Sequence, residues 1–178
     1  AGQFEVARSE VDKNRLLINS WLTKASAFDN PGDRMRLTGL EAARNDQVDV
    51  LNHLARHWAR EQGWLTGPDV AYRHAGSERA YAVGDHIQIT RNIRRPGEQR
   101  NLNNGTRALV TSAHDDGVHL TYWDADGQHD DRLTVEQAVT HSRPGYATTT
   151  QKLQGQTVKS LTIDLGGDRD LSSAYVAF

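Results

Sequence analysis

The chain has 178 residues, no cysteine and a formal net charge of −2, a length that suits one domain or one domain with a small insert. The absence of cysteine excludes a disulfide framework and a thiolate metal site, and the weak net charge means that a nucleic-acid partner would have to meet a local basic patch. No apolar run approaches the roughly 20 residues that span a bilayer, so we expect a cytoplasmic protein without a membrane partner.

The first third of the chain has the pattern of an α/β protein. Apolar residues at helical spacing predict an amphipathic helix over Ser9–Ala27, which Ser9 can cap. Turn residues over Asp29–Asp33 and a short strand over Met35–Leu40 follow. A second amphipathic helix is predicted over Asp46–Gln62, and Gly63 is placed to end it. The order helix, strand, helix favours an α/β fold.

The middle of the chain is different, because short alternating segments between turns replace the helices. Strands are predicted over His86–Thr90, Thr106–Ala113 and Val118–Trp123, and Leu133–Val139 is typical of a short strand followed by one helical turn. Asp115-Asp116-Gly117 and Asp126-Gly127 are hairpin signals. Four or five short strands in ~60 residues favour a small SH3-like β-barrel.

A polar run, Gly145–Val158, joins this region to a final α/β part that contains an apolar strand over Leu161–Leu165. Polar segments between β elements are frequent places for ligand sites. The predicted domain organisation is an α/β part over residues 1–80, a β-barrel insert over 81–140 and a second α/β part over 141–178.

A basic loop lies between two of the predicted barrel strands. The segment Arg91–Asn101 holds four arginines and one glutamate. Arginines on a loop suit contacts with phosphate that carry no base specificity. The alternative from composition alone is a solvated surface loop.

Nucleotide and metal motifs are absent from the printed sequence. It contains neither GxxxxGK[ST] nor GxGxxG. His53 and His57 lie four residues apart on one predicted helix, but no HExxH pattern or third ligand accompanies them, so we predict no metal site.

Five segments together resemble a helicase family. Residues 146–157 read Y-A-T-T-T-Q-K-L-Q-G-Q-T, which is similar to the fifth conserved motif of superfamily 1 helicases of the RecD-like branch. Residues 81–92 and 102–107 resemble the start of the SH3-like barrel inserted in these helicases. Residues 43–56 resemble a helix of their second RecA-like domain, and residues 170–178 resemble the start of their sixth motif.

The series is most like the helicase part of MobF-type conjugative relaxases of the TraA and TraI kind. Three positions differ from the family pattern: Gln151 replaces the usual His, Ala108 replaces a Gly, and Thr157 stands where other branches often have Glu. The Walker A and Walker B motifs and the arginine of the sixth motif are missing from the printed sequence. We therefore expect a helicase fragment that does not hydrolyse ATP alone.

The resemblance implies a partial RecA-like domain, of the P-loop NTPase type, with an inserted SH3-like barrel. It implies a role in an ATP-dependent DNA helicase of plasmid conjugation. Implied partners are single-stranded DNA, the first RecA-like domain of the parent protein, ATP with Mg in that parent, and a type IV secretion coupling protein. The alternative is a protein-interaction or translocation-signal module that derives from a degenerate helicase domain.

The resemblance also assigns roles to individual residues. Thr149 and Gln151 would contact a DNA phosphate, with Lys152 adding charge. The remaining candidates for the DNA-facing surface are Arg44, Arg91, Arg94, Arg95 and Asn104. Gln154, Gly155 and Thr157 would lie near the nucleotide, where glycine lets the backbone approach closely. The alternative for Gly145–Val158 is a capped core helix with a polar face, and the alternative for the barrel edge is docking to another domain.

Overall fold

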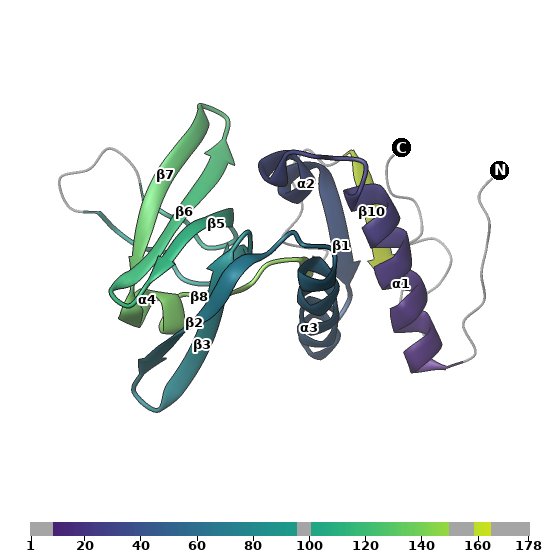
Figure 1. Cartoon of the computed structure of the whole chain (residues 1–178), viewed down its shortest axis with the longest axis horizontal. Helices are drawn as coiled ribbons and strands as arrows, with labels where there is room; N and C mark the ends of the chain where they lie inside the picture. The colour runs from purple at the N-terminus through teal and green to yellow at the C-terminus, as the bar shows by residue number, and fades with distance from the viewer. Residues whose placement is uncertain (1–8, 96–100, 150–158, 165–178) are drawn as a thin grey trace. The chain divides into compact units, whose positions relative to one another are not determined.

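The computed structural model describes residues 9–95, 101–149 and 159–164, and the chain divides into two compact units (Figure 1). The unit here called the parallel unit comprises residues 1–55 and 147–178. The antiparallel unit comprises residues 56–146. In sequence, the antiparallel unit is therefore an insertion in the chain of the parallel unit.

A three-stranded parallel sheet forms the centre of the parallel unit, with the strand order β10-β1-β9. Its strands are β1 (Thr38–Ala42), β9 (Ala147–Thr149) and β10 (Ser160–Asp164). All of β1 is buried, as expected for the middle strand of a parallel sheet that is covered on both faces. The pairing brings residues far apart in sequence together, since Leu40 lies next to both Ala147 and Thr162.

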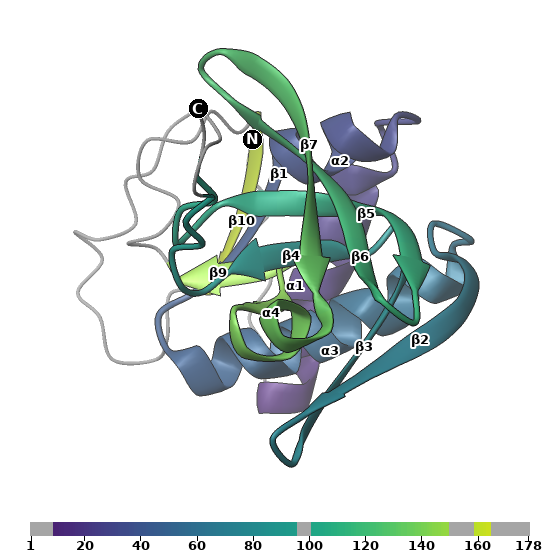
Figure 2. The ribbon, with the colours of Figure 1, turned by 90° about the vertical axis from the view of Figure 1, so that its left-hand side faces the viewer.

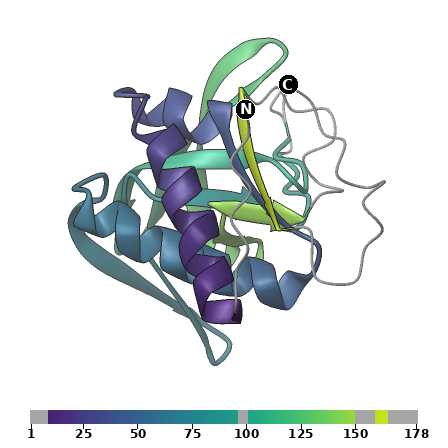
Figure 3. The same cartoon turned by 90° about the vertical axis from the view of Figure 1, so that its right-hand side faces the viewer.

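The first helix, α1 (Glu10–Ala25), packs along β1 and β10 (Figure 3). Its buried residues are Ile18, Trp21 and Ala25, which form one face of the helix. The Ser9 side chain accepts a hydrogen bond from the Asp12 backbone N–H at 3.1 Å, so the predicted cap and helix are confirmed.

The next element differs from the prediction. Residues Pro31–Leu37 form helix α2, and β1 begins only at Thr38, so the predicted strand was wrong at its start. Asn30 caps α2 by accepting from the Asp33 N–H at 3.0 Å, and Pro31 occupies the first helical position, where its missing N–H costs nothing. The residues interpreted as a turn are therefore a helix start.

Helix α3 (Asn45–Glu61) follows β1 and confirms the second predicted helix. Val48, Leu51 and Ala55 are fully buried on its inner face. The helix ends at Glu61, and Gly63 follows with a φ of 72°, the left-handed conformation that glycine adopts readily. Residues 45–55 of the helix belong to the parallel unit and the rest to the antiparallel unit.

A five-stranded antiparallel sheet with the order β7-β6-β5-β4-β8 dominates the antiparallel unit (Figure 2). A two-stranded hairpin and the short helix α4 (Val135–Thr140) pack with it. The hairpin consists of β2 (Thr66–His74) and β3 (Ser77–Val83), and the sheet consists of β4 (His86–Ile89), β5 (Arg107–His114), β6 (Gly117–Asp124), β7 (Gly127–Thr134) and β8 (Ser142–Pro144). The three strands predicted within residues 86–123 are confirmed as β4, β5 and β6.

The hairpin contributes to the core of the antiparallel unit, because Tyr72 and Tyr81 are buried in one cluster with Ile87, Val110 and Leu120. The compact unit consequently begins and ends outside the predicted barrel limits of 81 and 140. Among the described strands no ladder joins β7 to β8. The SH3-like closed barrel therefore stays a prediction.

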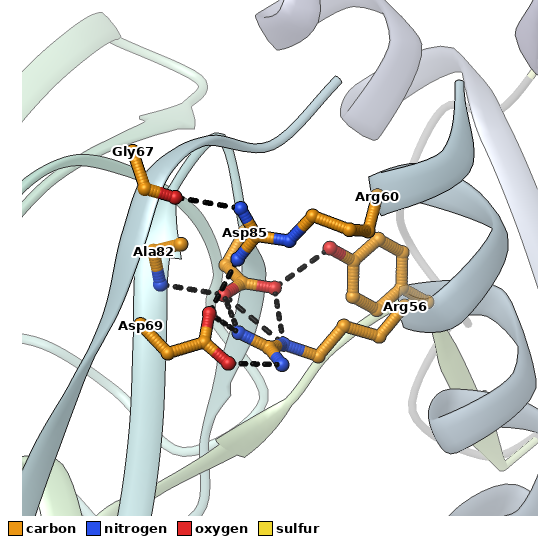
Figure 4. A network of polar contacts seen from close by, with 7 residues as sticks. Arg56, Arg60, Gly67, Asp69, Ala82 and Asp85 are labelled. Carbon is orange, nitrogen blue, oxygen red and sulfur yellow. Dashed lines mark hydrogen bonds and ion pairs between the residues drawn. The ribbon is translucent and has the colours of Figure 1, made fainter. Parts of the chain in front are cut away.

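The buried carboxylate of Asp85 ties the two ends of the antiparallel unit together (Figure 4). Asp85 accepts hydrogen bonds from the Arg56 guanidinium at 2.8 and 2.9 Å and from the Tyr146 hydroxyl at 2.8 Å. It also accepts one from the Ala82 backbone N–H at 2.8 Å. Arg56 and Tyr146 are the first and last residues of the unit, so one side chain closes the insertion.

A second acid completes the same network. Arg56 pairs with Asp69 at 2.8 Å, and Arg60 bonds both Asp69 and the Gly67 carbonyl. Burial opposes the charge of Arg56, but its hydrogen bonds to Asp69 and Asp85 outweigh burial and raise its pKa. The hydrogen bond from Arg56 in turn lowers the pKa of Asp69. Burial and the neighbouring Asp85 raise the pKa of Tyr146 well above its ordinary value.

We expect Asp85→Asn to lower the free energy of unfolding by about 3 kcal/mol, because it removes one partner of a buried ion pair and leaves the other in place. Asp116→Asn is the matched control, since it breaks the exposed Asp116–Arg132 pair of the same unit and should cost less than about 1 kcal/mol. Urea denaturation of both variants measures the difference. Equal losses would contradict the role given to Asp85.

Titration of the buried Tyr81 should contribute a loss of stability at alkaline pH. Burial raises the pKa of Tyr81 to about 12, above the value of about 10 in the unfolded chain. The stabilisation is complete below pH ~10 and is lost as the pH rises towards ~12, at up to about 1.4 kcal/mol per pH unit. Burial lowers the pKa of Arg107 to about 10. The titration of Arg107 therefore changes the stability in the opposite direction, and it does so equally in the unchanged protein and in a Tyr81 variant.

The comparison of Tyr81→Phe with the unchanged protein isolates the tyrosine. The variant loses the hydrogen bond with Ser142, so we expect lower stability at neutral pH and a shallower decline above pH ~10. Unfolding free energies measured across this pH range test it. Parallel pH profiles would show that Tyr81 does not titrate as its burial requires.

Candidate nucleic-acid interface

The carboxyl ends of the three parallel strands meet at one edge of the sheet in the parallel unit. Ala42 at the end of β1 is in register with Thr149 at the end of β9 and with Asp164 at the end of β10. In open α/β sheets, ligands bind outside the carboxyl ends of the strands. We call Arg44, Thr149 and Asp164 the carboxyl edge.

Two predicted DNA contacts lie at this edge. Arg44 is exposed and follows Ala42 by two residues, immediately before the first turn of α3. Thr149 is partly buried at the end of β9. The register of β1 and β9 thus places Thr149 beside Ala42, the second residue before Arg44, although the two strands are more than a hundred positions apart in the sequence.

Each of the two charged side chains of the carboxyl edge, Arg44 and Asp164, pairs with a side chain of opposite charge. Arg44 donates to both carboxylate oxygens of Asp46, at 3.0 and 2.5 Å. This hydrogen-bonded pair raises the pKa of Arg44 and lowers that of Asp46. The pair is fully exposed, and such pairs are easily exchanged for other partners. Asp164 is buried and pairs with Lys13 at 3.0 Å.

The polar run after Thr149 falls outside the described residues. This applies to Gln151, Lys152, Gln154, Gly155 and Thr157. Their roles toward DNA and nucleotide stay predictions.

The arginine loop, residues 90–106, connects β4 to β5 in the antiparallel unit. Its base is closed by an antiparallel bridge in which Ile93 and Leu102 exchange backbone hydrogen bonds of 2.7 and 3.1 Å. Both side chains are buried in the core of the unit. The Asn92 side chain accepts from the Asn104 N–H at 2.7 Å. Backbone and side-chain hydrogen bonds therefore hold the base of the loop in place.

The predicted arginine contacts separate into two kinds. Arg95 is partly buried, pairs with Asp131 at 2.8 Å, and donates to the Arg132 carbonyl and to Gln137. Arg91 and Arg94 are exposed, and neither pairs with an acid among the residues that the structure describes. Asn104 is also exposed. The structure thus presents Arg91, Arg94 and Asn104 to solvent and holds Arg95 against β7.

Sequence reasoning gave no role to Asn52, which is buried in α3 and bonded to the backbone of β9. A signal was available, because a polar residue next to the apolar positions Leu51 and Ala55 in a helix has to be hydrogen-bonded when it is buried. For Arg95 there was no such signal, since Asp131 lies 36 residues away.

Metal sites and membrane-spanning helices can be judged for the residues that the structure describes. Among these residues, no group of three or more His, Asp or Glu side chains is arranged to hold a metal ion. No helix in the same ranges has the length and apolar character needed to cross a membrane.

Comparison with known proteins gives one sequence relative and one structural neighbour to report. No protein-family model matches the chain. The conjugal transfer protein TraA of Agrobacterium fabrum (strain C58) is 30% identical over 146 residues, which cover 82% of this chain and 13% of TraA. A double mutant of the Pif1 helicase from Bacteroides gives a TM-score of 0.41 at 13% identity, over 90% of this chain and 40% of the helicase chain. The chain thus spans only a small part of TraA.

Arg95→Ala should destabilise the protein by about 1–2 kcal/mol, because it removes charge-assisted hydrogen bonds at a partly buried site. Arg94→Ala, which removes an exposed arginine from the same loop, should change the stability by less than about 0.5 kcal/mol. Arg95→Lys should not restore the loss, since a lysine cannot reproduce the forked donors. Urea denaturation distinguishes these outcomes, and equal effects of the two alanine variants would contradict the anchoring role of Arg95.

Proposed function

We propose that the chain is part of a DNA helicase of conjugative transfer and contributes contacts to single-stranded DNA. The observation that carries the proposal is the carboxyl edge of the parallel sheet. Thr149 ends β9 at this edge, in register with Ala42, and Arg44 follows Ala42 by two residues; the sequence resemblance assigns Thr149 and Arg44 separately to DNA. The identity with a protein of conjugal transfer supports the same reading.

The chemistry of the carboxyl edge suits a phosphate backbone. A threonine hydroxyl is a neutral donor that can position a strand without reading its sequence. The exposed Arg44–Asp46 pair supplies a cation that can exchange its carboxylate for a phosphate. The interface requires no base-specific contact, as expected for a protein that moves along DNA.

The arginine loop of the antiparallel unit is a second proposed DNA contact. Arg91 and Arg94 provide two exposed guanidinium groups on a loop whose base is fixed by the Ile93–Leu102 bridge. A fixed base reduces the entropy that binding has to overcome. Asn104 adds a neutral donor on the same loop.

The nucleotide part of the proposal is supported by the sequence resemblance. Gln154, Gly155 and Thr157 would form one side of a cleft for ATP and Mg, and the first RecA-like domain of a longer parent protein would form the other. A type IV secretion coupling protein and a cytoplasmic location belong to the same proposal.

The salt dependence of DNA binding tests the arginine loop. With a labelled dT oligonucleotide of roughly 12 nucleotides, we expect log K to fall linearly with log salt. The double variant Arg91→Ala/Arg94→Ala should make this slope shallower by about 1.4, which is about 0.7 for each phosphate contact on a single strand.

The matched control is Arg73→Ala/Arg79→Ala, which removes two exposed arginines from the β2–β3 hairpin of the same unit. Its slope should equal that of the unchanged protein. If both double variants shift the slope equally, the loop is not a specific contact. If the unchanged protein shows no salt-dependent binding, the DNA proposal is wrong and the protein-interaction alternative gains support.

A further inference from the structure

Asn52 is a buried polar residue in the middle of α3, with only 3% of its surface exposed. Its two side-chain atoms hold one residue of the sheet. Its Oδ1 accepts from the Ala147 N–H at 2.8 Å, and its Nδ2 donates to the Ala147 carbonyl at 3.2 Å. The amide thus bonds both backbone groups of the first residue of β9.

This arrangement imitates a neighbouring strand. β9 has three residues and pairs only with β1 among the described strands. The N–H and C=O of one strand residue point to the same side, and both need partners when they are buried. Ala147 is fully buried, so the Asn52 amide supplies what a further strand would otherwise supply.

The hydrogen bonds of Asn52 to Ala147 also affect the position of Thr149. Ala147 and Thr149 are two residues apart, and they are in register with Leu40 and Ala42 of β1. A strand this short has few bonds of its own to fix its position. The bonds of Asn52 at one end of β9 therefore restrict the place of Thr149 at the other end.

We propose that Asn52 is a positioning residue that fixes β9 and so holds Thr149 at the carboxyl edge for its contact with single-stranded DNA. The DNA part of this inference rests on the proposed function. Asn52 itself touches only the backbone of β9. Its effect on binding is transmitted through Thr149.

Four variants of the whole chain separate positioning from simple loss of stability. Asn52→Leu has a similar shape and removes both hydrogen bonds. Asn52→Asp keeps the acceptor for the Ala147 N–H and loses the donor. Gln47→Leu is the matched control, because it removes another amide of α3, which bonds Asn14 at 2.6 Å and not β9. Thr149→Ala removes the proposed contact.

Binding of the dT oligonucleotide gives the first measurement. Thr149→Ala should weaken binding about tenfold, as the loss of a hydrogen bond to a charged group does. Asn52→Leu should weaken binding by a similar factor, and Gln47→Leu by less than about twofold. In the Asn52→Leu background, Thr149→Ala should add less than about twofold, since the contact is already lost.

Amide hydrogen exchange gives the second measurement and needs no DNA. Asn52→Leu should increase the exchange rate at Ala147 and Thr149 by about tenfold or more, with the amides of β4, which does not pair with β9, unchanged. Asn52→Asp should preserve the protection of the Ala147 amide more than Asn52→Leu does. Unchanged exchange at β9 in Asn52→Leu would overturn the inference whatever the DNA result.

The outcomes also distinguish this inference from the proposed function. If Thr149→Ala weakens binding equally with and without Asn52, Asn52 does not position it and the inference is wrong. If Thr149→Ala does not change oligonucleotide binding while the arginine-loop variant weakens it, the loop still supports the DNA proposal, but the inference about Asn52 is wrong. If neither variant affects binding, the proposed function fails, and with it the DNA part of the inference.

Discussion

The hydrogen bonds of the Asp85 carboxylate are the constraint on which the inserted unit depends. An insertion is compatible with its host domain only when its two ends lie close together, and closing a long loop has an entropic cost. Asp85 meets both ends directly, through Arg56 and Tyr146. The carboxylate is buried, and its neighbours satisfy it with several donors, so it does not remain an unpaired charge.

A second pair of hydrogen bonds lies next to these in sequence. Asn52 is one helical turn before Arg56 on α3, and Ala147 follows Tyr146 directly. Within the parallel unit Asn52 holds Ala147, and within the antiparallel unit Arg56 and Tyr146 share Asp85. The chain passes from one unit to the other at residues 55/56 and 146/147. Next to both places, buried hydrogen bonds hold the chain within each unit. The strand that delivers Thr149 begins at one of these places.

The helices and strands with strong periodicity could be predicted from the sequence. The stripe of Val48, Leu51 and Ala55 identified α3, and alternation identified β4, β5 and β6. The sequence G-Q-H-D-D-R-L-T of β7 has almost no apolar alternation, and its pairing with β6 makes it a strand. The dipeptide Asn30-Pro31 is compatible both with a turn and with the start of a helix. The apolar residues that follow it decide which of the two forms.

The candidate site was predictable to a smaller extent. The resemblance located Arg44, Thr149 and the arginine loop, but not their geometry. Partners far away in sequence decide which arginine of the loop is ion-paired and which is exposed, as with Arg95 and Asp131. The same holds for Asp85, whose partners Arg56 and Tyr146 are 29 and 61 residues away. Local patterns carry no information about such pairs, because the fold alone brings them together.

The proposed function rests on DNA contacts by the carboxyl edge in the parallel unit and by the arginine loop in the antiparallel unit. Backbone amide chemical shifts recorded while a dT oligonucleotide is added test it most directly. The amides of Arg44 and Thr149 in the parallel unit, and those of Arg91, Arg94 and Asn104 in the antiparallel unit, should shift as the oligonucleotide is added, while those of the β2–β3 hairpin stay in place. Shifts confined to the hairpin, or the absence of shifts at both the carboxyl edge and the arginine loop, would contradict the proposed function.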